Sequence, residues 1–226
     1  MTPVQNEEPS WKTLFRTGGI AAVVMAVFIP IQSVIFLVSP PPATVEGAFA
    51  LFQSNKLMGL LDYDLMLGID YIFMILLFLA LFVALRKFSP SLMAIGVTFG
   101  IIGIAIWFSS NPAFQLLILS DQYYAAATEA QKSIILAAGQ AQLVNFTGSS
   151  FNASYIMDGV ALLLVNIVML RSGAFGKKTA ILGIVMSALM FVPPTVPVVG
   201  IYFSMISLIP TFIWLILIAR RFFRMA

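Results

Sequence analysis

The sequence predicts an all-α integral membrane protein, a bundle of six transmembrane helices with both termini in the cytoplasm and amphipathic helices in the outer loops. Of its 226 residues, 61% are hydrophobic and 9% are charged, whereas a soluble domain carries about 25% charged residues. Apolar runs recur that are long enough to cross roughly 30 Å of hydrocarbon. Because one compact bundle fits this length, we expect a single integral membrane domain over residues 1–226.

Six apolar segments are predicted to span the bilayer. They cover residues 18–38, 65–85, 92–109, 155–170, 179–199 and 201–219. Proline lacks a backbone N–H and fits poorly inside a helix. We therefore expect Pro193, Pro194 and Pro197 to break the outer end of the fifth segment.

The charged residues predict the orientation of these segments. Short loops that remain in the cytoplasm are enriched in Lys and Arg. With six spans and a cytoplasmic N-terminus, ten of the twelve basic residues fall on the inner side, and only Lys56 and Lys132 lie outside. Glu7 and Glu8 are placed inside, and the other acidic residues on or near the outer side. This sorting predicts a multi-pass protein of the plasma (inner) membrane with both termini cytoplasmic.

Two outer loops are long enough to hold helices of their own. In the first, Thr44 is a candidate cap for a helix over 44–53. The second covers residues 111–154 and contains helix-like stretches at 114–119 and 128–146, where Thr128 and Gln131 have the spacing of a helix start. We expect these helices to lie on the membrane surface or to cap the bundle.

Two carboxylates fall inside predicted spans, where a charge costs about 2.5–3.5 kcal/mol on insertion scales. Asp158 precedes Arg171 by thirteen residues, which places it about 20 Å above the cytoplasmic edge. Asp70 precedes Arg86 by sixteen residues, or about 24 Å. Both helices run from outside to inside, so the two carboxylates are expected at similar depths in the outer leaflet.

The functional hypothesis is an outward-facing polar cavity that binds a ligand. Carboxylates of this kind bind a cation, or do acid–base chemistry when burial keeps one of them protonated. The cavity would be lined by Asp62, Asp70 and Asp158, with Tyr71, Tyr155 and Asn152 near its rim.

The alternative is that these polar residues are interfacial or structural. Asp62 and Asp64 would then be solvated, and Asp70 would hydrogen-bond to a neighbour or pair with Lys56 or Lys132. For Asn166, an interhelical hydrogen bond is expected rather than a substrate contact.

Several classes of function are excluded by what the sequence lacks. It has no Cys and no His, which removes disulfides, thiol nucleophiles, zinc sites with Cys or His ligands, and histidine-ligated haem. No Walker loop, nucleophile elbow or dinucleotide fingerprint occurs, and no basic stripe could follow a nucleic acid. We therefore assign no catalytic residue, metal or cofactor.

Several short motifs stand out along the chain, among them Ala50-Leu51-Phe52, Gly59-Leu60-Leu61-Asp62, Leu85-Arg86-Lys87, Ser89-Pro90-Ser91-Leu92, Ser120-Asp121-Gln122-Tyr123 and Met169-Leu170-Arg171-Ser172. With these motifs the sequence resembles an uncharacterised bacterial family of six-helix membrane proteins, known only as a domain of unknown function. The resemblance covers nearly the whole chain and implies six helices in a bacterial plasma membrane, but it supplies no catalytic residues.

Three classes of function remain open. The first is binding or transport of a small lipophilic ligand that enters from the outer side. The second is a non-catalytic accessory subunit that has a membrane-protein partner. The third is an intramembrane enzyme using the outer aspartates with an oxygen-ligated divalent cation. Because the middles of the spans are almost wholly apolar, a hydrophilic pathway is disfavoured, and binding of a lipid-like ligand ranks first and catalysis last.

Overall fold

The computed structural model describes residues 11–226, so the predicted cytoplasmic position of Glu7 and Glu8 lies outside the described residues. The described part folds into ten helices. They are α1 (Lys12–Val38), α2 (Val45–Ser54), α3 (Lys56–Asp62), α4 (Leu65–Leu85), α5 (Pro90–Ser110), α6 (Ala113–Ala125), α7 (Glu129–Thr147), α8 (Ser149–Ser172), α9 (Lys177–Leu189) and α10 (Gly200–Met225).

Five helical stretches within residues 11–226 are long and apolar enough to cross a membrane. They are α1, α4, the nearly continuous pair α5–α6, the nearly continuous pair α7–α8, and α10. Large aliphatic and aromatic side chains remain exposed along these helices, as on Val27, Ile101 and Ile213. Lipid is the solvent in which such a surface is stable, so the protein is a multi-pass membrane protein.

The fifth predicted segment, 179–199, differs from the structure. Helix α9 ends at Leu189, and residues 190–199 form turns around Pro193, Pro194 and Pro197. Its 13 residues extend about 20 Å at the helical rise, less than the roughly 30 Å of the hydrocarbon core. The helix therefore ends well inside the predicted segment, and the prolines do not break only its outer end.

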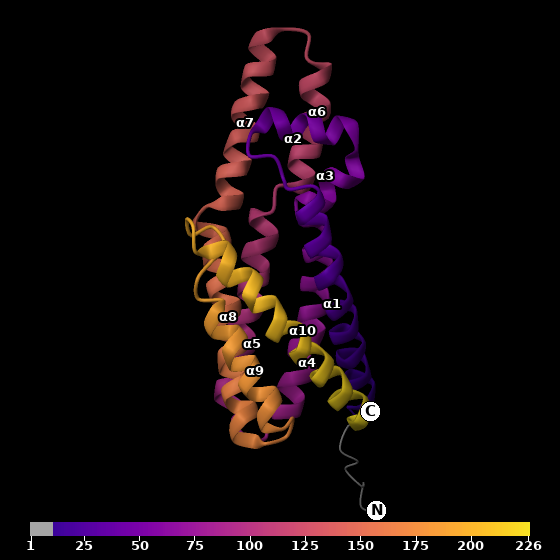
Figure 1. Ribbon diagram of the computed structural model, residues 1–226, viewed down its shortest axis with the longest axis vertical. Coiled ribbons are helices and arrows are strands. Elements are labelled where there is room, and N and C mark those ends of the chain that lie inside the picture. Colours follow the sequence, from indigo (N-terminus) through magenta and orange to yellow (C-terminus); the bar gives the residue numbers. More distant parts are fainter. Residues whose placement is uncertain (1–10) are drawn as a thin grey trace, which may run out of the picture.

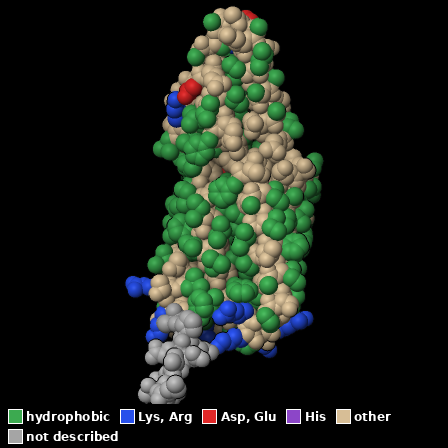
Figure 2. Space-filling model, turned by 180° about the vertical axis from the view of Figure 1, so that it is seen from behind, with side chains coloured by type: hydrophobic (Ala, Val, Ile, Leu, Met, Phe, Trp, Pro, Cys, Tyr) green, Lys and Arg blue, Asp and Glu red, His purple; other side chains and the backbone are tan. Residues whose placement is uncertain are grey.

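The long helices form an elongated bundle (Figure 1). The closest packing joins α5 to α8, where Gly96 and Gly103 of α5 bring the two backbones together. The beginning of α1 and the end of α10 lie at the same end of the bundle, with Gly18 against Phe222 and Gly19 against Phe223. Figure 2 shows that Lys and Arg side chains gather at this end; it is called the basic end below.

At the opposite end, α2, α3, α6 and α7 share a second apolar core (Figure 1). The predicted helix starts are confirmed. Thr44 accepts a hydrogen bond from the Gly47 N–H at the start of α2, and Thr128 and Gln131 form a capping box at the start of α7. Helices α6 and α7 project as a hairpin, and the short helix α3 was not predicted.

Candidate functional site: a buried chain of carboxyl and hydroxyl groups

Asp158 lies on α8 and is buried against α5. Its carboxyl group occupies the space left by Gly103, where an added Cβ would come within 2.6 Å of Asp158 Oδ1. Only 2% of the residue is exposed, and neither carboxyl oxygen has a hydrogen-bond partner among the described residues. Buried polar groups in proteins are nearly always hydrogen-bonded, so two unsatisfied oxygens at one carboxyl group need an explanation.

Tyr71 of α4 lies beside this carboxyl group, and Trp107 of α5 packs against Tyr71. The phenol of Tyr71 is close enough to Asp158 for an electrostatic interaction, but the strict geometry of a hydrogen bond is not met. The rings of Tyr71 and Trp107 are 4.9 Å apart between centroids, and Trp107 Nε1 is buried without an acceptor in the described structure. An indole donor and two carboxyl acceptors are thus left unused in one buried cluster.

Tyr155 and Asn152 connect α8 to the last part of the chain. Tyr155, one turn before Asp158, places its hydroxyl 3.5 Å from Ser204 Oγ on α10. The Thr195 hydroxyl donates a hydrogen bond to Asn152 Oδ1. These contacts hold residues 190–199 and the start of α10 against α8.

Asp62 is anchored at the end of α3. The Ser39 hydroxyl donates a 2.8 Å hydrogen bond to Asp62 Oδ2 and so ties α3 to the end of α1. Burial raises the pKa of Asp62, and the hydrogen bond from Ser39 partly opposes this rise. Asp62 Oδ1 has no hydrogen-bond partner in the described part of the chain.

Asp64 immediately precedes α4 in a left-handed backbone conformation, with φ of 68°, and its side chain makes no capping hydrogen bond. It is buried, its carboxyl group interacts electrostatically with Tyr71, and burial raises its pKa to about 7. The interpretation of Asp62 and Asp64 as solvated residues is therefore wrong, because α2, α3 and α6 cover this end of the bundle.

Asp70 lies on α4 and is half-buried, and its Oδ1 has no hydrogen-bond partner among residues 11–226. The expected alternative, an ion pair with Lys56 or Lys132, is wrong. Lys56 pairs with Asp121 at 2.8 Å, and Lys132 pairs with Glu129 at 3.0 Å.

The structure brings some predicted site residues together and separates others. Tyr71, Asp158 and Tyr155 lie close enough to interact electrostatically. Asp62, Asp70 and Asp158 form no group that could hold a metal ion within the described residues. The divalent-cation site required by the enzyme alternative is therefore not assembled.

Sequence reasoning missed three members of this cluster. Neither Trp107 nor Ser204 was among the predicted site residues, and Asp64 appeared only in the alternative in which it is solvated. The available signal was the spacing of Gly96, Gly100 and Gly103, which places small residues on one face of α5. Small residues at such spacing allow another helix to approach closely.

Asn166 has the structural role expected for it. Trp214 Nε1 of α10 donates a 2.9 Å hydrogen bond to Asn166 Oδ1, and Asn166 Nδ2 donates to the Leu162 carbonyl at 2.8 Å. The predicted interhelical hydrogen bond is confirmed.

Comparison with known proteins gives one family. The family model described as Domain of unknown function (DUF4386) matches residues 17–220, and the chain belongs to this family. No curated protein and no solved structure matches. The expected resemblance to an uncharacterised membrane family is confirmed.

Proposed function

We propose that this DUF4386 protein binds or transports a small lipophilic ligand that carries a cationic group, with Asp158 as its anchor. The observation that carries the proposal is the buried Asp158 carboxyl group, whose two oxygens lack hydrogen-bond partners in the described structure. Ionisable residues inside membrane spans are costly and mark substrate or ion pathways by default.

The chemistry of the ligand follows from the surroundings of Asp158. No Lys or Arg forms an ion pair with this carboxyl group among the described residues, so a donor from a ligand would satisfy it. The neighbouring rings of Tyr71 and Trp107 offer aromatic faces, which attract cations. The remaining core is aliphatic and aromatic. These features favour a lipophilic amine over a strongly hydrated ion.

The proposed topology has six spans in the plasma membrane, with both termini cytoplasmic. The described chain begins and ends at the basic end of the bundle (Figures 1 and 2). An even number of crossings accounts for this arrangement, and α9 with residues 190–199 supplies the sixth. The positive-inside rule makes the basic end cytoplasmic. Asp158, toward the other end of its helix, then belongs to the outer leaflet.

The test compares the unfolding temperature of the purified protein with and without a phenylalkylamine. The matched probe is a phenylalkanol with the same chain length. The amine is expected to raise the unfolding temperature of the wild-type protein and of Asp121→Asn, but not of Asp158→Asn, and the alkanol to raise none of them. Equal stabilisation of wild type and Asp158→Asn by the amine would refute the proposal, because Asp158 would then affect only baseline stability.

An accessory subunit is the second candidate, and the α6–α7 hairpin favours it. Ile134 and Val144 of α7 are 71% and 60% exposed, and a partner chain on this projecting hairpin would cover them. Purification in mild detergent is expected to retain a stoichiometric partner if this is the function. A clean single species that responds to the amine would favour ligand binding instead.

A further inference from the structure

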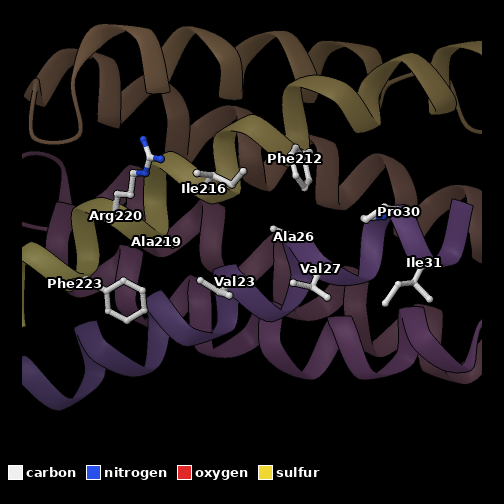
Figure 3. Close-up of a pocket in the computed structure, with 10 residues that line it drawn as sticks. All are labelled: Val23, Ala26, Val27, Pro30, Ile31, Phe212, Ile216, Ala219, Arg220 and Phe223. Carbon is white, nitrogen blue, oxygen red and sulfur yellow. The ribbon is translucent and has the colours of Figure 1, made fainter.

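An apolar groove of about 550 Å³ runs between α1 and α10. In Figure 3 the two helices present their side chains along its two sides. Val23, Val27 and Pro30 of α1 line one side, and Ile216, Arg220 and Phe223 of α10 line the other. None of them belongs to the Asp158 cluster, so this groove is a separate feature.

The groove is closed at the basic end and widens away from it. Gly19 of α1 lies against Phe223 of α10, and a Cβ on Gly19 would approach the Phe223 ring to within 2.9 Å. Beyond this contact α10 runs obliquely to α1, and the helices separate (Figure 1). Pro30, which lines the groove, removes one backbone hydrogen bond from α1 at the wide part.

The length of the groove matches one leaflet of a bilayer. Residues 23–31 of α1 extend about 12 Å at the helical rise, and residues 212–223 of α10 extend about 16 Å. Half of a hydrocarbon core that is roughly 30 Å thick is about 15 Å. The groove therefore has room for an acyl chain of the leaflet on the basic side, and not for a span of another helix.

Two arginines flank the basic end of the groove. Arg220 lines the groove itself, with its guanidinium turned away from α1 in Figure 3. Arg16 precedes Val23 by seven residues and so lies on the same face of α1. Both side chains are exposed, and no hydrogen bond or ion pair joins either of them to another described residue. Two unpaired cations beside an apolar channel complement a phosphate attached to an acyl chain.

We propose that this groove is a binding site for an anionic phospholipid of the leaflet on the basic side. One acyl chain occupies the channel between Val27 and Ile216, and the phosphate and anionic headgroup contact Arg16 and Arg220. The site goes beyond the proposed ligand function, and it holds a membrane lipid whether or not the Asp158 cluster binds a ligand.

The test is native mass spectrometry of the delipidated protein after incubation with equal amounts of phosphatidylglycerol and phosphatidylcholine that have identical acyl chains. The wild-type protein is expected to retain phosphatidylglycerol preferentially. Arg16→Gln and Arg220→Gln should each lower its retention about fivefold, the effect expected for one basic residue near an anionic surface. Arg171→Gln makes the same charge change at an exposed position outside the groove and should leave retention unchanged.

A second variant tests the channel rather than the charges. Val27 is 51% exposed within the groove, so Val27→Trp fills the channel without entering the core and should lower the retention of both lipids. The control Val185→Trp changes an exposed residue of α9 outside the groove. Val23→Phe replaces Val27→Trp if the latter does not fold. The proposal is overturned if the arginine variants retain as much phosphatidylglycerol as Arg171→Gln, or if the filled groove retains as much lipid as the control.

Discussion

A buried carboxyl group is costly mainly when it is charged. Two aspartates just before α4, Asp62 and Asp64, are buried in this protein. The sequence left open whether Asp62 lines a cavity or is solvated together with Asp64. They are buried because α2 and α3 fold back over them, with Tyr63 stacked on Phe52 at 5.9 Å between centroids. Burial of a residue by other elements of the fold leaves no local sequence pattern that could predict it.

Asp64 should make the stability of the protein depend on pH. Burial raises its pKa from the ordinary value of 3.8 to about 7, so the folded protein binds this proton more tightly than the unfolded chain does. Its contribution to stability is fully present below about pH 4 and is lost as the pH rises through about 7. Asp64→Asn removes this dependence, and asparagine suits the left-handed backbone at φ of 68°.

The measurement is the unfolding temperature in detergent between pH 5 and pH 8. We expect the wild-type value to fall over this range and the Asp64→Asn value to fall less. Asp121→Asn is the control, because Asp121 is an exposed carboxylate paired with Lys56. An Asp64→Asn variant with the same pH slope as the wild type would show that Asp64 is not the responsible group.

Gly183 of α9 is predicted to tolerate no side chain. A Cβ at this position would overlap Asn166 Oδ1, the acceptor of the Trp214 indole N–H. Gly183→Ala must displace Asn166 and leave a buried donor unsatisfied, which costs about 1–3 kcal/mol. Thermal unfolding should show a clear loss in Gly183→Ala and little change in Ile181→Ala, at an exposed position of α9.

The combined variant Gly183→Ala/Asn166→Ala separates the overlap from general packing effects. With Asn166 shortened, the new methyl group has room. The loss of stability in the double variant should therefore be smaller than the sum of the losses in the two single variants. Fully additive losses would mean that the overlap with Asn166 is not the cause.

At the scale of elements, the sequence predicted the helices best where one physical signal dominated. Predicted segment 65–85 coincides with α4, and 92–109 lies within α5. Both were predicted well because each is an uninterrupted apolar run whose length matches the thickness of the hydrocarbon core. The caps at Thr44 and Thr128 likewise mark the starts of α2 and α7. The fifth segment failed because hydropathy continued through Val192, Val196 and Val198 while the prolines between them ended the helix at Leu189.

The turn after α9 contains a strained residue. Val198 has φ of 65°, and its side chain is 81% exposed, so it has a β-branched side chain in a left-handed conformation and little packing to offset the cost. Val198→Asn should stabilise the protein by up to about 1–2 kcal/mol, since asparagine adopts this conformation more readily. Val196→Asn, at a residue without positive φ, should give no gain. An unfolding temperature for Val198→Asn at or below the wild-type value would contradict this reasoning.

At the scale of the whole molecule, the sequence located residues of the site but could not pair them. Asp158 was identified from its depth in an apolar segment, and Tyr71 and Tyr155 were predicted near the rim of the cavity. These residues come together only because α4, α5 and α8 pack against one another. Gly103 allows this packing, since it leaves room for the Asp158 carboxyl group. Glycines recur in most membrane helices, so the sequence alone did not single out this one.

The number of crossings is the property of the whole molecule on which both proposals depend, and it can be measured directly. The chain contains no cysteine, so single cysteines can report which side of the membrane each loop faces. Ala126→Cys lies between α6 and α7, Ala174→Cys between α8 and α9, and Val198→Cys between α9 and α10. With six spans, a membrane-impermeant maleimide added to intact cells should label positions 126 and 198, and position 174 only after the membrane is opened.

If α9 with residues 190–199 does not cross, 198 will be labelled together with 174. In that case α1 and α10 would not begin and end on one side, and Arg16 and Arg220 could not contact a lipid of the same leaflet.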